Sequence, residues 1–377
     1  MIVAIPKETH PGETRTPIIP ASIEKLKKLS IEVVVESGVG ATINVPDEAY
    51  ERAGARVESV RTSLLAGADI VMRIRKPPIE EIVHLKKGAL HISFLDPFNE
   101  PKLIDALRDA GVTALSMEMI PRTTLAQKMD ALSSQASLGG YVAVILAAER
   151  LNKVLPMMTT PAGTIAASRV FVIGVGVAGL QAIATARRLG ARVEAFDTRP
   201  VVEEQVKSLG ARFVKIDLGE TGQTEQGYAK ALTDEQLALQ RQGMAKVCAA
   251  SDIVITTAQL FGRKAPLIVT DEMIRGMAAG SVIVDMAVES GGNVEGSRVD
   301  EEVMVGGVRI IGVSNLPGRV PVHASQMYSS NLTALLTHFW DKDGGRFNLN
   351  LEDEILRSSV ITHDHDIINE RIRELRS

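Results

Sequence analysis

The sequence predicts an α/β protein with two Rossmann-like domains, each built on a mostly parallel sheet. Short β-branched runs alternate with helical patterns along most of the chain, which is typical of βαβ units. The alternation occurs in two separate series, on either side of a long apolar stretch. At 377 residues the chain is also long enough for about two domains of ordinary size.

The first series lies in the first third of the chain, where the apolar runs have the length of buried parallel strands. Strands are predicted over residues 2–5, 32–36, 69–74, 89–94 and 113–118. A helix is expected from Pro20, because proline suits the first helical turn. A long helix is then predicted over residues 125–153, interrupted by Gly139 and Gly140.

The second series follows this helix and has the same character. Its predicted strands are residues 169–174, 192–197, 212–217, 252–257, 281–287 and 308–313. Residues 324–340 form a further predicted helix, and the tail predicts a small hairpin that turns near residues 363–366. We therefore expect the second domain (133–319) to be inserted in the first (1–132 plus 320–377), with a cleft between them.

Composition excludes several classes of protein. A net charge of −4 and a pI near 6.0 argue against a nucleic-acid partner. The single cysteine, Cys248, permits no intramolecular disulfide, and without an H-E-x-x-H motif no metal site is expected. His363 and His365 are interpreted as parts of a turn. No signal peptide is evident, and the apolar run at 141–148 is shorter than the roughly 20 residues that span a bilayer.

The strongest local motif is a glycine turn between a predicted strand and a helix. Gly174, Gly176 and Gly179 form G-x-G-x-x-G, with Val175 and Val177 inside it. In dinucleotide-binding proteins the first glycine permits a tight turn, the second lets the backbone approach a pyrophosphate, and the third packs helix against strand. The simpler alternative is a glycine turn without a ligand.

An acidic residue, Asp197, ends the next predicted strand and is followed by Thr198 and Arg199. This is the place where a carboxylate binds the adenosine ribose and disfavours a 2′-phosphate. Asp197 therefore favours NAD over NADP, whereas Arg199 could accommodate that phosphate.

Other polar segments allow two interpretations each. Residues 217–243 are longer than most connections and contain Gly227 and Tyr228, which predicts either a disordered loop or a lid. Residues 6–20 follow the first strand and form either a solvated turn or a ligand loop. By propensity alone, "PRTTLAQKMDALSSQ" (121–135) is a polar turn and helix start, and its serines lack a nearby base for nucleophilic catalysis.

Several of these segments coincide with one family. "IPKE…GETR", "PRTTLAQKMDALSSQ", "GVGVAGLQAIATARRLGA", "VDMAVESGGN" and "LEDEILRSSVITHD" resemble the NAD(H)-binding component of proton-translocating nicotinamide nucleotide transhydrogenases. The likeness covers essentially the whole chain, and the wider fold group also includes alanine dehydrogenases.

The resemblance implies specific binding residues. Arg122, Gln127, Asp130 and Ser133 match positions beside the nicotinamide and its ribose, and residues 174–179 match the glycine turn. The ribose-binding acid matches Asp197, the tyrosine of a mobile loop matches Tyr228, and a position near the adenine matches Gln240.

The resemblance also implies a reaction and partners. Hydride would pass directly between NAD(H) on this chain and NADP(H) on a partner subunit, so that approach and orientation matter and no acid or base is needed. A homodimer is expected, docked on the cytoplasmic face of the membrane through membrane-spanning subunits that couple the exchange to proton movement.

Two alternatives remain open. An alanine dehydrogenase would need a lysine and a histidine for its keto acid, where this chain has Arg75 and Asp96. An aspartate cannot replace a histidine acid near neutral pH. A module that senses NAD without catalysis is the other alternative.

Overall fold

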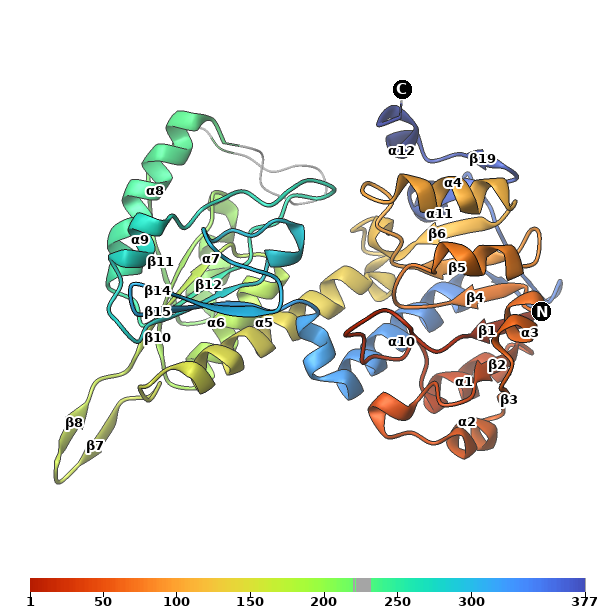
Figure 1. Ribbon diagram of the computed structural model, residues 1–377, viewed down its shortest axis with the longest axis horizontal. Helices are drawn as coiled ribbons and strands as arrows, with labels where there is room; N and C mark the ends of the chain where they lie inside the picture. Colours follow the sequence, from red (N-terminus) through yellow and green to blue (C-terminus); the bar gives the residue numbers. More distant parts are fainter. Residues whose placement is uncertain (220, 222–231, 377) are drawn as a thin grey trace. The chain divides into compact units, whose positions relative to one another are not determined.

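The computed structural model describes residues 1–219, 221 and 232–376, and they form two compact units. Unit 1 comprises Met1–Gln135 and Gly318–Ser377, and unit 2 comprises Ala136–Pro317. Both units contain a large, mostly parallel sheet with helices, as Figure 1 shows. The predicted α/β class is therefore confirmed.

Unit 1 is built on an eight-stranded sheet with the order β19-β18-β6-β5-β4-β1-β2-β3. Six of these strands pair in parallel, whereas β18 is antiparallel to both β6 and β19. Their bounds are β1 Ile2–Ile5, β2 Glu32–Glu36, β3 Arg56–Glu58, β4 Ile70–Met72, β5 Leu90–Ser93, β6 Thr113–Ser116, β18 Val360–His363 and β19 Asp366–Ile367. The predicted hairpin in the tail is therefore present, and Asp364 and His365 form its left-handed turn.

The helices of unit 1 bury apolar side chains against this sheet, and most are short. They are α1 Pro20–Lys27, α2 Asp47–Ala53, α3 Arg61–Ala66, α4 Pro101–Asp109, α10 Pro321–His338, α11 Glu354–Ser359 and α12 Glu370–Glu374. The longest, α10, contributes Tyr328, Leu332, Leu335 and Leu336 to the main core. A two-stranded ribbon, β16 (Trp340–Asp341) with β17 (Arg346–Phe347), follows α10.

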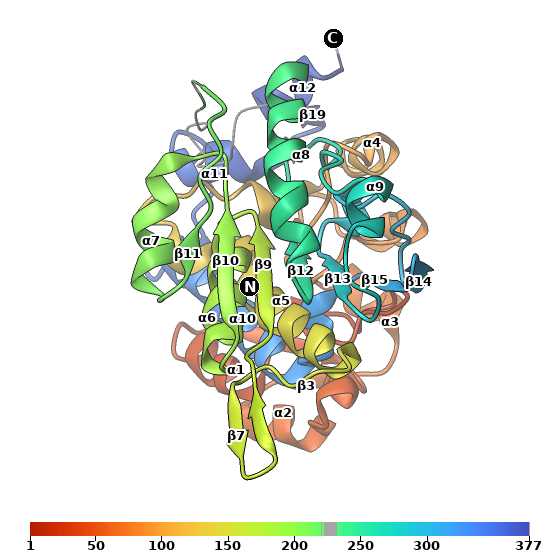
Figure 2. The ribbon, with the colours of Figure 1, turned by 90° about the vertical axis from the view of Figure 1, so that its left-hand side faces the viewer.

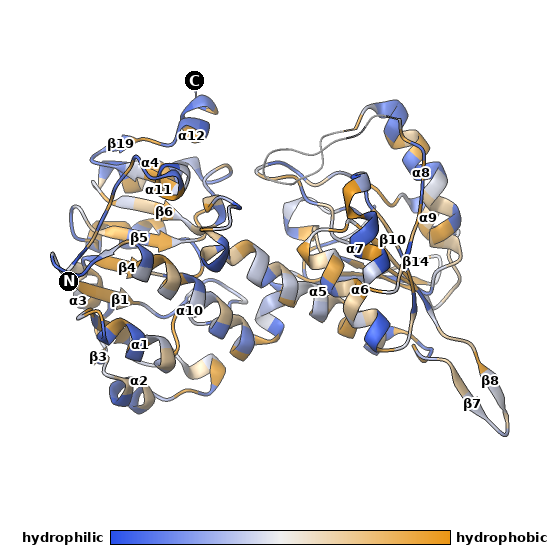
Figure 3. Cartoon of the chain, turned by 180° about the vertical axis from the view of Figure 1, so that it is seen from behind, coloured by the Kyte–Doolittle hydropathy of each residue, from blue (hydrophilic) through white to orange (hydrophobic). Residues whose placement is uncertain are grey.

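Unit 2 contains a seven-stranded sheet with the order β11-β10-β9-β12-β13-β15-β14 (Figure 2). All neighbours are parallel except β14 and β15. The strands are β9 Arg169–Ile173, β10 Arg192–Phe196, β11 Arg212–Phe213, β12 Ile253–Thr256, β13 Val282–Asp285, β14 Glu301–Val305 and β15 Val308–Gly312. The central strands β12 and β13 are fully buried, and Figure 3 shows the hydrophobic colouring of the sheet strands.

The helices of unit 2 are α6 Val177–Arg188, α7 Glu203–Ser208, α8 Asp234–Ala249 and α9 Asp271–Arg275. A separate ribbon, β7 (Met158–Thr160) with β8 (Gly163–Ile165), protrudes from the rest of the unit in Figures 1 and 2. All six of its strand residues are exposed. It carries apolar side chains at Met158 and Ile165, with Met157 just before it.

The long helix α5 (Ala131–Arg150) begins later than predicted. Residues 125–130 are not α-helical: η4, a short 3₁₀ turn, covers Gln127–Met129. The reason is Asp130, whose Oδ1 accepts from the Ser133 backbone N–H at 2.9 Å and so caps the helix. Within the described ranges α5 alone is long and apolar enough to cross a membrane by length and composition, and 44% of its most apolar window is buried. A single helix of this kind is weak evidence for a membrane span.

Candidate functional site

The glycine turn lies at the topological switch point of unit 2. From β9 the chain moves outward to β10 and β11, and later returns to the other side of β9 with β12. The connections after β9 and β12 therefore diverge beyond the carboxyl ends of two neighbouring parallel strands. Open α/β sheets bind ligands in the crevice that this divergence leaves.

The three glycines of this turn meet different requirements. Gly174 has φ +93°, and a Cβ there would lie 2.6 Å from Thr257 Oγ1. A Cβ on Gly179 would lie 1.9 Å from the Gly174 carbonyl oxygen, so α6 approaches the turn too closely for any side chain. Gly176 has φ −85°, and a Cβ there would meet nothing within 4 Å.

The fold therefore requires glycine at 174 and 179 but not at 176. Gly176 is the N-cap of α6, and the space beside it is open at the positive end of a twelve-residue helix. Val175 is buried and Val177, the first residue of α6, is 39% exposed. This geometry fits the approach of a phosphate group to the backbone.

Asp197 lies at the end of β10 and holds both the turn and Arg199. Its carboxylate accepts from the Val175 backbone N–H at 2.7 Å. It also accepts from the Arg199 backbone N–H, Nε and Nη2, at 2.9, 2.8 and 2.7 Å. The hydrogen bond to Asp197 raises the pKa of the Arg199 guanidinium. The N–H groups of Val175 and Arg199 fill the acceptor positions of the Asp197 carboxylate. Ribose hydroxyls could therefore bind Asp197 only if Arg199 moved. The intervening Thr198 accepts from Thr221 Oγ1 through its carbonyl, at 2.6 Å.

The carboxyl ends of β12 and β13 add residues that sequence reasoning did not single out: Thr257 directly follows β12, and Asp285 is the last residue of β13. Thr257 Oγ1 donates to the Gly174 carbonyl at 3.0 Å and so fixes the glycine turn from the neighbouring strand. The fully buried Asp285 accepts from the backbone N–H groups of Ala287, Asn293 and Val294 at 3.0–3.2 Å. The signal for both was available, because each lies at or near the carboxyl end of a predicted strand, where ligands bind.

In unit 1 the segment of residues 121–135, called the polar loop below, brings together three of the predicted site residues. Asp130 Oδ2 accepts from Ser133 Oγ at 2.6 Å and lies 3.9 Å from Arg122 Nε. The Asp130 side chain is 13% exposed and that of Arg122 is 35% exposed. Gln127 is exposed on the 3₁₀ turn η4.

The polar loop is held by apolar anchors between its polar residues. Ala126 and Met129 are buried in the main core of unit 1, where Ala131 joins them. Arg122 and Gln127 therefore remain at the surface while the backbone between them is fixed. A polar surface on an anchored backbone can orient a ligand through directional hydrogen bonds.

Unit 1 has its own switch point, between β1 and β4, and it is filled by charged side chains. Glu13 accepts from Arg15 Nε and Nη2, both at 2.7 Å, and from Arg75 Nε at 2.9 Å. Burial opposes ionisation of Glu13, but hydrogen bonds and charge from Arg15 lower its pKa to about 2. Burial raises the pKa of Glu8 to about 7. Glu13 thus accepts hydrogen bonds from the guanidinium groups of both Arg15 and Arg75.

The other chemically relevant groups are placed as follows. Gln240 is buried in α8, whereas Gly227 and Tyr228 lie outside the described residues. Burial raises the pKa of the Cys248 thiol to about 12, so it is not a nucleophile at neutral pH. Across the described ranges, no group of three or more His, Cys, Asp or Glu side chains could hold a metal ion.

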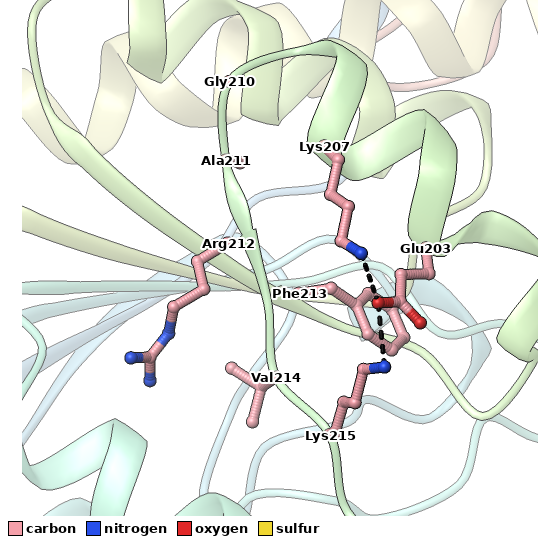
Figure 4. Close-up of a pocket in the computed structure, with 8 residues that line it drawn as sticks. All are labelled: Glu203, Lys207, Gly210, Ala211, Arg212, Phe213, Val214 and Lys215. Carbon is pink, nitrogen blue, oxygen red and sulfur yellow. Dashed lines mark ion pairs between the residues drawn. The ribbon is translucent and has the colours of Figure 1, made fainter.

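A pocket of about 700 Å³ lies over the edge strand β11 (Figure 4). Lys207 Nζ and Lys215 Nζ both point to Glu203 Oε1, at 2.7 and 3.0 Å. Glycine-turn residues do not line this pocket. The candidate binding residues are therefore the glycine turn in unit 2 and, separately, the polar loop in unit 1.

Both halves of the chain match one family. Residues 4–139 match the N-terminal domain of the alanine dehydrogenase/PNT family, and residues 143–370 match its C-terminal domain. The chain belongs to the alanine dehydrogenase/PNT family. The expected resemblance is thereby confirmed.

Among the members of this family, transhydrogenase subunits are highly similar to the chain. It is 42% identical over 376 residues to the first part of NAD(P) transhydrogenase subunit alpha of Rhodospirillum rubrum, and this match covers 98% of each chain. The protein of the same name from Rickettsia prowazekii is 44% identical over 377 residues, with 99% of this chain and 97% of that protein covered. A transhydrogenase structure from Sinorhizobium meliloti is 45% identical, with a TM-score of 0.88, and covers 97% of this chain and 100% of its own.

Proposed function

We propose that this alanine dehydrogenase/PNT family member is the NAD(H)-binding subunit of a proton-translocating NAD(P) transhydrogenase. The observation that carries the proposal is 42–44% identity, over nearly the full length of both chains, to two proteins named as the first part of NAD(P) transhydrogenase subunit alpha. An alanine dehydrogenase activity is disfavoured. Arg75 is bound to the buried Glu13, and Asp96 offers a carboxylate where a histidine acid is needed.

The residues of unit 2 fit a dinucleotide. The open space at Gly176 and the N-terminus of α6 suit a pyrophosphate, because backbone N–H groups and the helix dipole both favour negative charge there. In this proposal Asp197 binds the adenosine ribose after Arg199, which now donates to its carboxylate, moves aside. The bound NAD(H) would supply or accept the hydride. In this proposal Val175, Val177, Thr198, Gly227, Tyr228 and Gln240 complete the contacts with the nucleotide.

In the same proposal, the polar loop orients the reacting part of the cofactor. Arg122, Gln127, Asp130 and Ser133 contact the nicotinamide and its ribose, and they supply hydrogen bonds without acid–base chemistry. A hydride transfer between two nicotinamide rings needs close approach, correct orientation and exclusion of water. The capping bond from Ser133 fixes Asp130 for this task.

The proposal includes partner subunits. NADP(H) would bind to a separate subunit, and membrane-spanning subunits would couple the hydride exchange to proton translocation. This chain would attach peripherally to them on the cytoplasmic face of the membrane. A homodimer is part of the same proposal, and the exposed apolar side chains Met157, Met158 and Ile165 of the β7–β8 ribbon are available for its interface.

The decisive experiment mixes the purified chain with a separately purified NADP(H)-binding subunit of a related transhydrogenase. With NADH and an oxidised NADP analogue, the mixture should reduce the analogue, and neither protein alone should do so. NADH binding without exchange would support the sensing module instead. Reduction of NAD by alanine with the chain alone would support an alanine dehydrogenase.

A further inference from the structure

The helix α10 carries a buried asparagine whose carboxamide joins two segments of the polar loop. Asn331 is 6% exposed. Its Nδ2 donates to the Lys128 carbonyl at 2.9 Å, and its Oδ1 accepts from Ser134 Oγ at 2.7 Å. The Lys128 carbonyl can only accept, so the amide nitrogen must face it and the amide oxygen must face the serine.

These two contacts enclose Asp130 from both sides along the chain. Lys128 lies in the middle of η4, directly after Gln127, and Ser134 lies in the first turn of α5. Between them, Asp130 accepts from the backbone N–H and hydroxyl of Ser133 at 2.9 and 2.6 Å. Asn331 therefore holds the backbone that presents Gln127 and Asp130.

Packing alone does not explain an asparagine at this position. Its neighbours Leu332 and Leu335 on α10 belong to the apolar main core of unit 1. A buried carboxamide is tolerated only when its hydrogen bonds are satisfied. What it adds over an apolar side chain is direction, because it binds one carbonyl and one hydroxyl of the polar loop.

We propose that Asn331 is a positioning residue for hydride transfer, acting through the polar loop without touching the cofactor. This inference rests on the proposed function. Asn331 fixes η4 and the first turn of α5, so that Gln127 and Asp130 meet the nicotinamide and its ribose in one orientation. A displacement of about 1 Å in such groups can lower a rate by about 100-fold.

The test is Asn331→Asp, which keeps the side-chain size but cannot donate to the Lys128 carbonyl when ionised. At saturating NADH we expect the exchange rate to fall about 10-fold or more, while the Kd for NADH changes less than about 3-fold. In the free chain, amide hydrogen exchange across residues 127–131 should become faster. Thr333→Val is the matched control, because it removes only a bond within α10, to the Ser329 carbonyl.

A second variant keeps the proposal testable if Asn331→Asp does not fold. Ser134→Ala removes the hydroxyl that binds Asn331 at 2.7 Å, and that also lies 3.1 Å from the Ala131 carbonyl. It should lower the exchange rate in the same direction by a smaller factor. In the double variant the effects of Asn331→Asp and Ser134→Ala on the exchange rate should not be additive, because both substitutions break the same hydrogen-bond network.

Two results would overturn the positioning role. One is a wild-type exchange rate and wild-type amide protection in both variants. The other is a lower Tm with an unchanged rate per folded molecule, which would make the role of Asn331 structural only. Failure of the proposed function is distinct, because the wild-type chain itself would then exchange no hydride with the NADP(H)-binding subunit.

Discussion

Gly176 should tolerate a methyl group in the fold but not in the nucleotide-bound state. Its φ of −85° suits alanine, and the added Cβ would meet nothing within 4 Å. The free energy of unfolding of Gly176→Ala should therefore stay within about 1 kcal/mol of wild type, because alanine restricts the unfolded chain but is a poorer N-cap than glycine. The methyl group would instead occupy the space that a pyrophosphate needs.

The loss of NADH affinity can be bounded from the same geometry. If the methyl group displaces the phosphate from one backbone N–H, one charge-assisted hydrogen bond worth about 1.5–3 kcal/mol is lost. That corresponds to a rise in Kd of about 10- to 150-fold. Isothermal titration calorimetry with NADH measures this change, and chemical denaturation measures the stability.

Two other glycines are matched controls. Gly276 has φ −75° and its nearest neighbour to an added Cβ lies at 3.4 Å, so Gly276→Ala should leave both stability and NADH affinity near wild type. Gly179→Ala should lower the unfolding free energy by about 3 kcal/mol or more, because its Cβ would overlap the Gly174 carbonyl. Wild-type NADH affinity in Gly176→Ala would refute the assignment of the phosphate site.

Three further predictions follow from the contacts of the site. Arg199→Ala removes the cation that neutralises Asp197, so NADPH should bind still more weakly relative to NADH. Asp197→Asn should instead reduce the preference for NADH over NADPH. Competitive binding of the two nucleotides measures both effects, and tighter NADPH binding in Arg199→Ala would contradict the role given to Asp197. Gln127→Ala should lower hydride exchange about 10-fold with less than about 3-fold change in NADH affinity, and equal losses would argue against an orienting role; Lys102→Ala, at an exposed position on α4, is the control. Because burial raises the pKa of Glu8 from 4.5 to about 7, the folded chain keeps a proton that the unfolded chain loses, so this group's contribution to stability is present below pH 4.5 and is lost as the pH rises to about 7. Glu8→Gln should reduce the change of the denaturation midpoint with pH between pH 4.5 and about 7. An unchanged pH dependence in this variant would show that another group causes it.

Strand positions could be predicted because burial on both faces leaves a continuous apolar run. The predicted strands at residues 2–5 and 32–36 coincide with β1 and β2. The strands that escaped prediction lack this signal: β3 and β14 lie at sheet edges, both strands of the β7–β8 ribbon are exposed, and β16 and β17 are only two residues long each. Their pairing depends on neighbours that a local pattern does not specify.

The start of α5 illustrates the same limit at the candidate site. The apolar pattern extends back to Leu125, but the helix begins only after Asp130 caps it. The 3₁₀ turn before it is held by Asn331, which lies about 200 residues further along the chain. Spacing identified the glycine turn, yet only the three-dimensional structure separates Gly176, whose surroundings are open, from Gly174 and Gly179, which the fold requires. Likewise, only the folded chain shows that Arg199 occupies the carboxylate of Asp197.

The buried Asp285 affects how mutational screens of this chain should be interpreted. Gly291 and Gly292, in the segment that Asp285 binds, both have positive φ, and a Cβ on Gly292 would lie 2.8 Å from Asp285 Oδ2. We therefore expect the backbone of the "VDMAVESGGN" segment to lose order when Asp285, Gly291 or Gly292 is replaced. In a growth selection such variants would lose growth in the same way as variants that lose activity. Protein abundance measured in parallel would distinguish these variants from Gly176 variants. Gly176 variants should accumulate to normal levels and still not support growth.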